Sequence, residues 1–224
     1  ALERIGTTRL PLHLTATMRG CLTALAGPQD ARAFDLAALF DPERHLDELE
    51  RVPVDEPMRR YLYAVTHNTA CPTILHAAGT RINVIPSEAV AEVDGRPVPG
   101  VTEAEMMAEV QAAVGRDVTI ELVVYKPGQE SDFQTPLFSA IQDTMASLAP
   151  GSTMVPILSS GGTDARSLVP RGVKVYGFNP LRAEEGVPTA GELMHNHDER
   201  ISLENLRFGL HAEFAIVERL MRTA

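Results

Sequence analysis

Positive charge, cysteine and aromatic side chains are scarce in this sequence. Its 224 residues include two cysteines, no tryptophan, and 20 Lys and Arg against 30 Asp and Glu, for a formal net charge of −10. Nucleic-acid backbones are bound by clustered Lys and Arg, so this balance argues against a nucleic-acid partner. Cys21 and Cys71 lie far apart and form no CxxC pair, which favours reduced thiols and a cytoplasmic protein.

Long apolar runs are missing as well. No stretch approaches the ~20 apolar residues that a membrane-spanning helix needs. Arg4 and Arg9 interrupt the start of the chain, where a signal peptide would carry its apolar region. We therefore expect no membrane partner. Hydrophobic and charged fractions of 44% and 22% are those of an ordinary globular protein, long enough for one large domain or two small ones.

The first half of the chain predicts an α+β unit. Residues 1–60 favour helices joined by loops that contain proline. Extended stretches follow at 72–79 and 82–96, the second with the turn signal Asp94-Gly95. A helix is predicted over Thr102–Val114, because Thr102 and Glu105 form a capping box. A further strand is predicted at Asp117–Tyr125, so we expect residues 69–125 to form a sheet with the helix packed on one face.

The second half predicts α/β layers with parallel strands. The polar segment 126–132 suits a domain boundary. A helix should begin at Thr135 and Pro136, and short apolar strands are expected at 154–158 and 173–178. Ser202 should cap a final amphipathic helix whose buried face is formed by Leu203, Leu206, Leu210, Phe214, Val217 and Leu220. Two or three strands are too few for a complete doubly wound sheet.

Candidate binding groups lie in three polar stretches. Gly161, Gly162 and Thr163 fall between a predicted strand and a short helix, where backbone N–H groups converge on an anion such as a carboxylate. A tight turn with Asp164 as a helix cap explains the same residues. Asn83 lies in one extended stretch. Arg96 ends the same stretch, where it suits either a forked contact with a carboxylate or a surface ion pair.

Histidines supply the candidate metal ligands. The run His195-Asn196-His197-Asp198-Glu199 offers neutral imidazoles to zinc, although solvated surface histidines fit it equally well. His67-Asn68-Thr69 is a further candidate because it precedes a predicted strand. His45-Leu46-Asp47 lies in a highly charged helical stretch, which favours a solvated helix face. Glu184-Glu185 lies in a loop beside Gly186 and Pro188, which favours a surface position.

Taken in order, five motifs resemble a known family. They are Asn83-Val84-Ile85-Pro86, Asp94-Gly95-Arg96, Gly161-Gly162-Thr163-Asp164-Ala165, Tyr176-Gly177-Phe178 and His195-x-x-Asp198-Glu199-Arg200. Together they resemble the C-terminal part of the co-catalytic zinc metallopeptidases and amidohydrolases that include aminoacylase, succinyl-diaminopimelate desuccinylase and glutamate carboxypeptidase. The resemblance covers roughly residues 69–207, and each motif is weak alone.

The resemblance implies an α/β protein with an inserted α+β lid, a two-layer sandwich that also forms a homodimer interface. It assigns residues 1–127 to the lid and 128–224 to the C-terminal half of a catalytic domain. It makes His195 a zinc ligand and places Asn83 near the substrate. It also implies that Arg96 and Gly161–Thr163 bind the carboxylate of the substrate. The implied activity is hydrolysis of an amide or peptide bond in an N-acyl amino acid or dipeptide, with two zinc ions in the complete enzyme.

The chain also departs from the family pattern. The family needs an upstream His-x-Asp pair, a bridging Asp, a Glu-Glu pair that supplies the general base, and a further carboxylate ligand. None of these occurs here in a suitable context, so we expect this chain alone to lack the base and to be inactive. Two readings follow: part of a zinc-dependent amidohydrolase, or a non-catalytic dimerising and binding module.

Overall fold

The computed structural model describes residues 1–27, 34–77, 79, 81–188 and 190–223. The chain divides into two compact units. The first consists of Ala1–Ser131 and Val155–Lys174, and the second of Asp132–Met154 and Val175–Ala224. The segment Val155–Lys174 therefore packs with the first half of the chain. The assignment of residues 1–127 to a lid and 128–224 to half of a catalytic domain stays a prediction.

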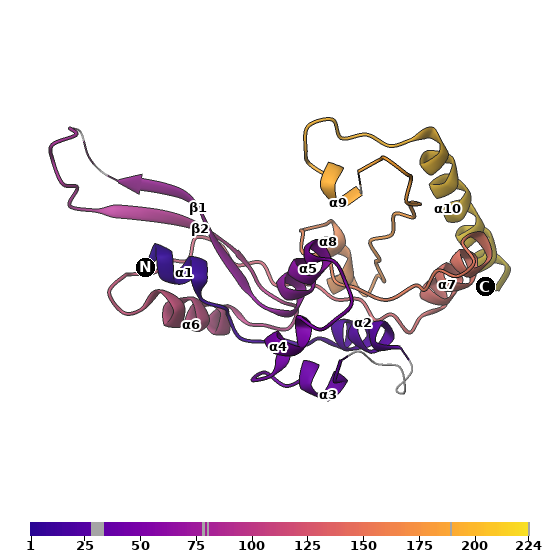
Figure 1. Cartoon of the computed structure of the whole chain (residues 1–224), viewed down its shortest axis with the longest axis horizontal. Coiled ribbons are helices and arrows are strands. Elements are labelled where there is room, and N and C mark those ends of the chain that lie inside the picture. Colours follow the sequence, from indigo (N-terminus) through magenta and orange to yellow (C-terminus); the bar gives the residue numbers. More distant parts are fainter. Residues whose placement is uncertain (28–33, 78, 80, 189, 224) are drawn as a thin grey trace. The chain divides into compact units, whose positions relative to one another are not determined.

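Five helices open the first unit, as the sequence predicts for residues 1–60: α1 (Leu2–Thr7), α2 (Ala16–Ala26), α3 (Leu36–Leu39), α4 (His45–Leu49) and α5 (Glu56–Thr66) (Figure 1). Capping side chains fix three of their starts. Thr15, Asp35 and Asp55 each accept a hydrogen bond from a backbone N–H in the first turn of the helix that follows. The helices enclose a core that is formed around Met18, Leu22, Leu39, Leu62 and Val65.

A β-hairpin follows the helices. Strand β1 (Thr69–Ala77) pairs antiparallel with β2 (Ala89–Arg96), from Thr69 opposite Arg96 to Ala77 opposite Ala89. The register shifts between Pro72 and Ile74, where proline has no N–H to give to the ladder. Strand β2 lies within the predicted stretch 82–96, whereas β1 overlaps the predicted stretch 72–79 and begins three residues before it.

Helix α6 (Glu103–Val114) confirms the most detailed local prediction. Thr102 accepts a bond from the N–H of Glu105, and the Glu105 carboxylate accepts the N–H of Thr102 at 2.7 Å. Gly115 ends the helix with φ +84°. The apolar face of α6 packs into a second core formed by Ile5, Val98, Val101, Met106, Val110 and Val114.

The predicted strand at Asp117–Tyr125 does not form. Val118, Ile120 and Tyr125 pack against the second core, but the segment has no strand partner. The strands predicted at 154–158 and 173–178 are also absent. Alternating side chains need only an extended backbone, whereas a strand also needs a neighbour to receive its hydrogen bonds. Within the described residues the sheet has two strands, so the two-layer sandwich and the parallel sheet are not confirmed.

Two long helices, α7 (Pro136–Leu148) and α10 (Leu203–Thr223), dominate the second unit. Thr135 caps α7 by accepting the Phe138 N–H at 3.2 Å, as predicted. The helices pack through a core of Ala140, Ile141, Met145, Ala212 and Ile216. No described helix combines the length and apolar character required to span a bilayer.

The structure corrects the prediction of which face of α10 is buried. Leu206, Leu210, Phe214 and Val217 are 44–69% exposed, whereas Ala212 and Ile216 on another side of the helix are buried. Periodicity located the helix and its apolar stripe correctly. It did not identify which face α7 covers, because that depends on the neighbour available in the chain.

Candidate binding site beside Arg96

The first unit contains a small pocket at the base of the hairpin. Its volume is about 40 Å³, enough for a group only slightly larger than a water molecule. Segments distant in sequence contribute its walls, which are formed by Ala64, Val65, Arg96, Pro97, Val98, Pro99, Leu158, Ser159 and Ser160. Arg96 and two serine residues therefore line a hollow whose other lining residues are mostly apolar.

Of the two roles that the sequence left open for Arg96, the structure shows the surface ion pair, and contact with a carboxylate ligand stays a prediction. Its Nε lies 2.7 Å from Asp94 Oδ2, and both side chains are about half exposed. This contact is a surface ion pair. A guanidinium has five N–H donors, so the bond to Asp94 leaves others for a ligand in the pocket.

The glycine loop follows directly after the serine wall. Gly161 donates its N–H to the Ser159 hydroxyl at 3.2 Å, and the Thr163 hydroxyl accepts the Ala165 N–H at 3.2 Å. The predicted short helix is α8 (Ala165–Leu168), where Asp164 occupies the cap position without a side-chain cap bond. The pocket thus brings Arg96 together with Ser159 and Ser160, while Gly161, Gly162 and Thr163 lie exposed beyond its lining.

Asn83 lies apart from this pocket. It is exposed in the turn between β1 and β2, beyond the Ala77–Ala89 pair that ends the hairpin, whereas Arg96 pairs with Thr69 at the other end. Eight residues of strand separate the two ends, which is roughly 25 Å. Within this chain, Asn83 and Arg96 are not parts of one site.

His195 belongs to the second unit, in a turn after α9 (Ala190–Leu193). Its backbone has φ +59° and donates its N–H to Glu199 Oε2 at 3.2 Å. The predicted proximity of His195 to Gly161–Thr163 stays a prediction, because the loop lies in the first unit. Among the described residues, no three His, Cys, Asp or Glu side chains form a group suited to a metal ion. Zinc sites use at least three protein ligands, so this donor set does not complete one.

Two residues that sequence reasoning placed at the surface have internal partners. His45 is fully buried, and its Nδ1 contacts the Leu39 carbonyl. The Glu184 carboxylate accepts bonds from Ser202 and from Asn205 Nδ2, and so supports the start of α10. The apolar spacing of Leu46 and Leu49 around His45 was the available signal, and the charged neighbours obscured it.

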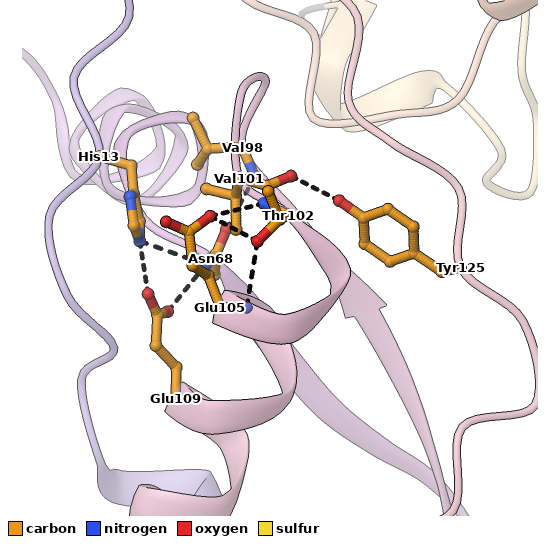
Figure 2. Close-up of polar contacts among 8 residues, drawn as sticks. All are labelled: His13, Asn68, Val98, Val101, Thr102, Glu105, Glu109 and Tyr125. Atoms are coloured by element: carbon orange, nitrogen blue, oxygen red, sulfur yellow. Dashed lines mark hydrogen bonds and ion pairs between the residues drawn. The ribbon is translucent and has the colours of Figure 1, made fainter.

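The buried node around Asn68 was not predicted as a unit. Asn68 is fully buried and bonds to Glu109 and to the backbone of Val98, while His13 Nε2 lies 2.6 Å from Glu109 Oε1 (Figure 2). Only His67-Asn68-Thr69 was noted in the sequence. His67 itself is buried and stacks on Tyr63 with ring centroids 4.2 Å apart, which gives it a structural role.

Comparison with known proteins gives consistent matches. Residues 33–118 match the profile of a peptidase dimerisation domain. The probable carboxypeptidase S-like 2 of Dictyostelium discoideum is 27% identical over 65% of this chain and 28% of its own length. The N-fatty-acyl-amino acid synthase/hydrolase PM20D1 of Mus musculus is 28% identical over 70% of this chain and 30% of its own length. Its Xenopus tropicalis counterpart is 31% identical over 63% and 27%.

The chain therefore spans less than a third of the length of these curated relatives. No solved structure matches it significantly.

Proposed function

We propose that this chain, which is similar to peptidases of the M20 family, is part of a metal-dependent hydrolase that cleaves an amide or peptide bond in a small substrate with a free carboxylate. Relatives are named as a carboxypeptidase and as an N-fatty-acyl-amino acid synthase/hydrolase. Both names denote substrates in which the amide lies next to a carboxylate. An N-acyl amino acid or a dipeptide is therefore the proposed substrate class.

The pocket beside Arg96 carries this proposal. It joins Arg96 to Ser159 and Ser160, which come from a segment more than sixty residues later in the chain. Guanidinium N–H groups and hydroxyls are donors, and a carboxylate is an acceptor of matching charge and size. We assign the carboxylate of the substrate to Arg96 and to the adjoining loop Gly161–Thr163. Asn83, at the far end of the hairpin, is proposed as a substrate contact outside this pocket.

Zinc is the proposed metal, with His195 as the ligand that this chain contributes. A bound zinc ion would polarise a carbonyl and lower the pKa of a water molecule. Among the described residues, no group of three His, Cys, Asp or Glu side chains supplies the further ligands, and no residue of this chain is proposed as the general base. We place these groups outside this sequence, which is consistent with the much greater length of the relatives.

The proposed partner is a second copy of the protein, bound through the lid. The match of residues 33–118 to a peptidase dimerisation domain supports this assembly. A cytoplasmic location also stays a proposal, since it rests on the cysteine usage alone.

A second function has one observation in its favour. A non-catalytic dimerising and binding module would need a dimerisation domain, and residues 33–118 match the profile of one. Mass measurement of the natural protein separates the two, because a longer polypeptide with bound metal supports the hydrolase.

Substitution of Arg96 tests the proposed carboxylate site in the natural full-length protein. We expect Arg96→Ala to raise KM for an N-acyl amino acid about tenfold or more, because a charged hydrogen bond is lost, with a smaller effect on the corresponding N-acyl amino amide. Arg116→Ala is the matched control, since Arg116 is exposed and does not line the pocket. Equal effects of Arg96→Ala on both substrates would remove the carboxylate from this site.

A further inference from the structure

The wall of the pocket that contains Arg96 has a single backbone donor after the arginine. The segment runs Arg96-Pro97-Val98-Pro99, and proline has no N–H. Val98 therefore provides the only N–H of the three residues that follow Arg96. Asn68 Oδ1 accepts that N–H at 2.8 Å. This bond ties the pocket wall to a residue that is fully buried.

The other end of Asn68 is held equally firmly. Its Nδ2 donates to Glu109 Oε2 at 2.7 Å, and Glu109 Oε1 lies 2.6 Å from His13 Nε2 (Figure 2). The carboxylate of Glu109 can accept hydrogen bonds but cannot donate them. The amide of Asn68 must therefore turn its NH₂ towards Glu109 and its oxygen towards Val98. Glu109, on α6, thereby fixes which atom Asn68 offers to the pocket wall.

His13 connects this node to the segment that precedes α2. The N–H of His13 donates to the Thr66 carbonyl at 2.8 Å, and Leu12 forms an isolated β-bridge with His67. Asn68 and Glu109 therefore join four parts of the unit: the segment before α2, the start of β1, α6 and the segment after β2. None of the node residues Asn68, Glu109 and His13 lines the pocket.

Further contacts support two walls of the pocket, the Pro97–Pro99 segment and the segment that contains Ser159 and Ser160. A Cβ on Gly128 would lie 2.7 Å from Pro99 N and 2.8 Å from the Pro97 carbonyl oxygen, so the backbone of Gly128 packs directly on this segment. On the serine wall, the Tyr61 hydroxyl donates to the Leu158 carbonyl at 2.7 Å. The Pro97–Pro99 segment is thus held between Asn68 and Gly128.

From these contacts we propose that Asn68 is a positioning residue for Arg96, with Glu109 and His13 orienting Asn68. The inference rests on the proposed carboxylate site, and it assigns to the buried amide the task of setting where the guanidinium lies relative to Ser159 and Ser160. Misplacement of a binding group by about 1 Å weakens recognition substantially. Loss of the Asn68 bond should therefore act on carboxylate affinity through Arg96.

The test measures binding of N-acetylalanine and of N-acetylalanine amide to the natural full-length protein by calorimetry, together with kcat and KM. We expect Asn68→Ala to weaken binding of the carboxylate compound about tenfold, with a much smaller change for the amide and in kcat. In a double-mutant cycle, Asn68→Ala should add little once Arg96 is alanine, because both changes remove the same contact.

A paired exchange keeps the test informative if Asn68→Ala folds poorly. Asn68→Asp retains the acceptor for Val98 but faces the carboxylate of Glu109, so it should weaken binding. Adding Glu109→Gln restores a donor opposite the new aspartate and should recover the affinity. Val52→Ala, in the buried core of the same unit, controls for general destabilisation and should leave binding unchanged.

Two results would contradict the inference in different ways. Unchanged carboxylate binding in Arg96→Ala would overturn the proposed site and the inference together. Loss of binding in Arg96→Ala with full binding in a folded Asn68→Ala variant would overturn the inference alone. Weakening by Asn68→Asp that Glu109→Gln does not recover would also overturn it.

Discussion

Two buried histidines in the first unit are kept uncharged by their surroundings. Burial lowers the pKa of His67 to about 4, and the nearby His45 ring, 5.1 Å away between centroids, adds to the shift. Burial also lowers the pKa of His45. An unfolded histidine binds a proton below about pH 6.5. Between pH 6.5 and 4 the unfolded state therefore holds more protons than the folded state. The contribution of the neutral histidine to the free energy of unfolding is fully present above pH 6.5 and is lost as the pH falls.

Acidification should accordingly destabilise the first unit. From the shift of His67 we expect a loss of about 3 kcal/mol in unfolding free energy between pH 7 and pH 4. Urea denaturation at several pH values, followed by circular dichroism, measures it. His67→Gln cannot titrate and should reduce the pH dependence, whereas His76→Gln, which removes an exposed histidine, should preserve it. Identical pH dependence in both variants would contradict the assignment.

His195 and His197 differ in how their backbones are held. The His195 N–H is bonded to Glu199 across a turn with positive φ at His195 and Asp198, whereas the His197 N–H is bonded to its neighbour Asn196. In the complete protein we expect His195→Ala to lower zinc content and hydrolysis together, by tenfold or more. Elemental analysis and an acyl-amino-acid assay measure both. His197→Ala is the control, and equal losses from the two changes would mean that the ligand was assigned incorrectly.

At the scale of elements, the segment 126–132 has a packing role in addition to its predicted role as a boundary. Gly128 lies against the Pro97–Pro99 backbone with no room for a Cβ. We expect Gly128→Ala to cost about 1–3 kcal/mol, because backbone atoms must move to admit the methyl group. Gly6→Ala, where a Cβ meets no atom within 4 Å, should be neutral or slightly stabilising. Thermal unfolding of both variants measures the difference, and a neutral Gly128→Ala would contradict the packing.

For the molecule as a whole, the chain of 224 residues should not act as an enzyme by itself. We expect it to bind fewer than two zinc ions and not to hydrolyse N-acyl amino acids, because His195 is the only ligand and no residue is the general base in the assignment proposed above. The exposed apolar face of α10, with Leu210, Phe214 and Val217, should promote self-association. Zinc analysis, an assay with added zinc and light scattering measure these properties. Two bound zinc ions or clear turnover would require ligands in His45-Leu46-Asp47 or Glu184-Glu185 after all.

The sequence by itself determined the elements whose causes are local. The capping box of Thr102 and Glu105, and Thr135 followed by Pro136, predicted α6 and α7, because a helix start depends on side chains within one turn. The hairpin strands were likewise predicted in outline from extended stretches, although Asp94-Gly95, predicted as a turn, lies within β2. The family motifs directed attention to Arg96, which lines the pocket, and to Gly161–Thr163, which follow its serine wall in the sequence.

The tertiary structure alone decided which of these elements meet. Alternation at 117–125 predicted a strand that has no partner, and periodicity in α10 could not reveal that Ala212 and Ile216, rather than Leu210 and Phe214, are covered. The pocket joins Arg96 to Ser159, and its wall depends on Asn68 and Gly128. Hydrogen-bond partners and burial are supplied by residues distant in sequence, so no local pattern contains them.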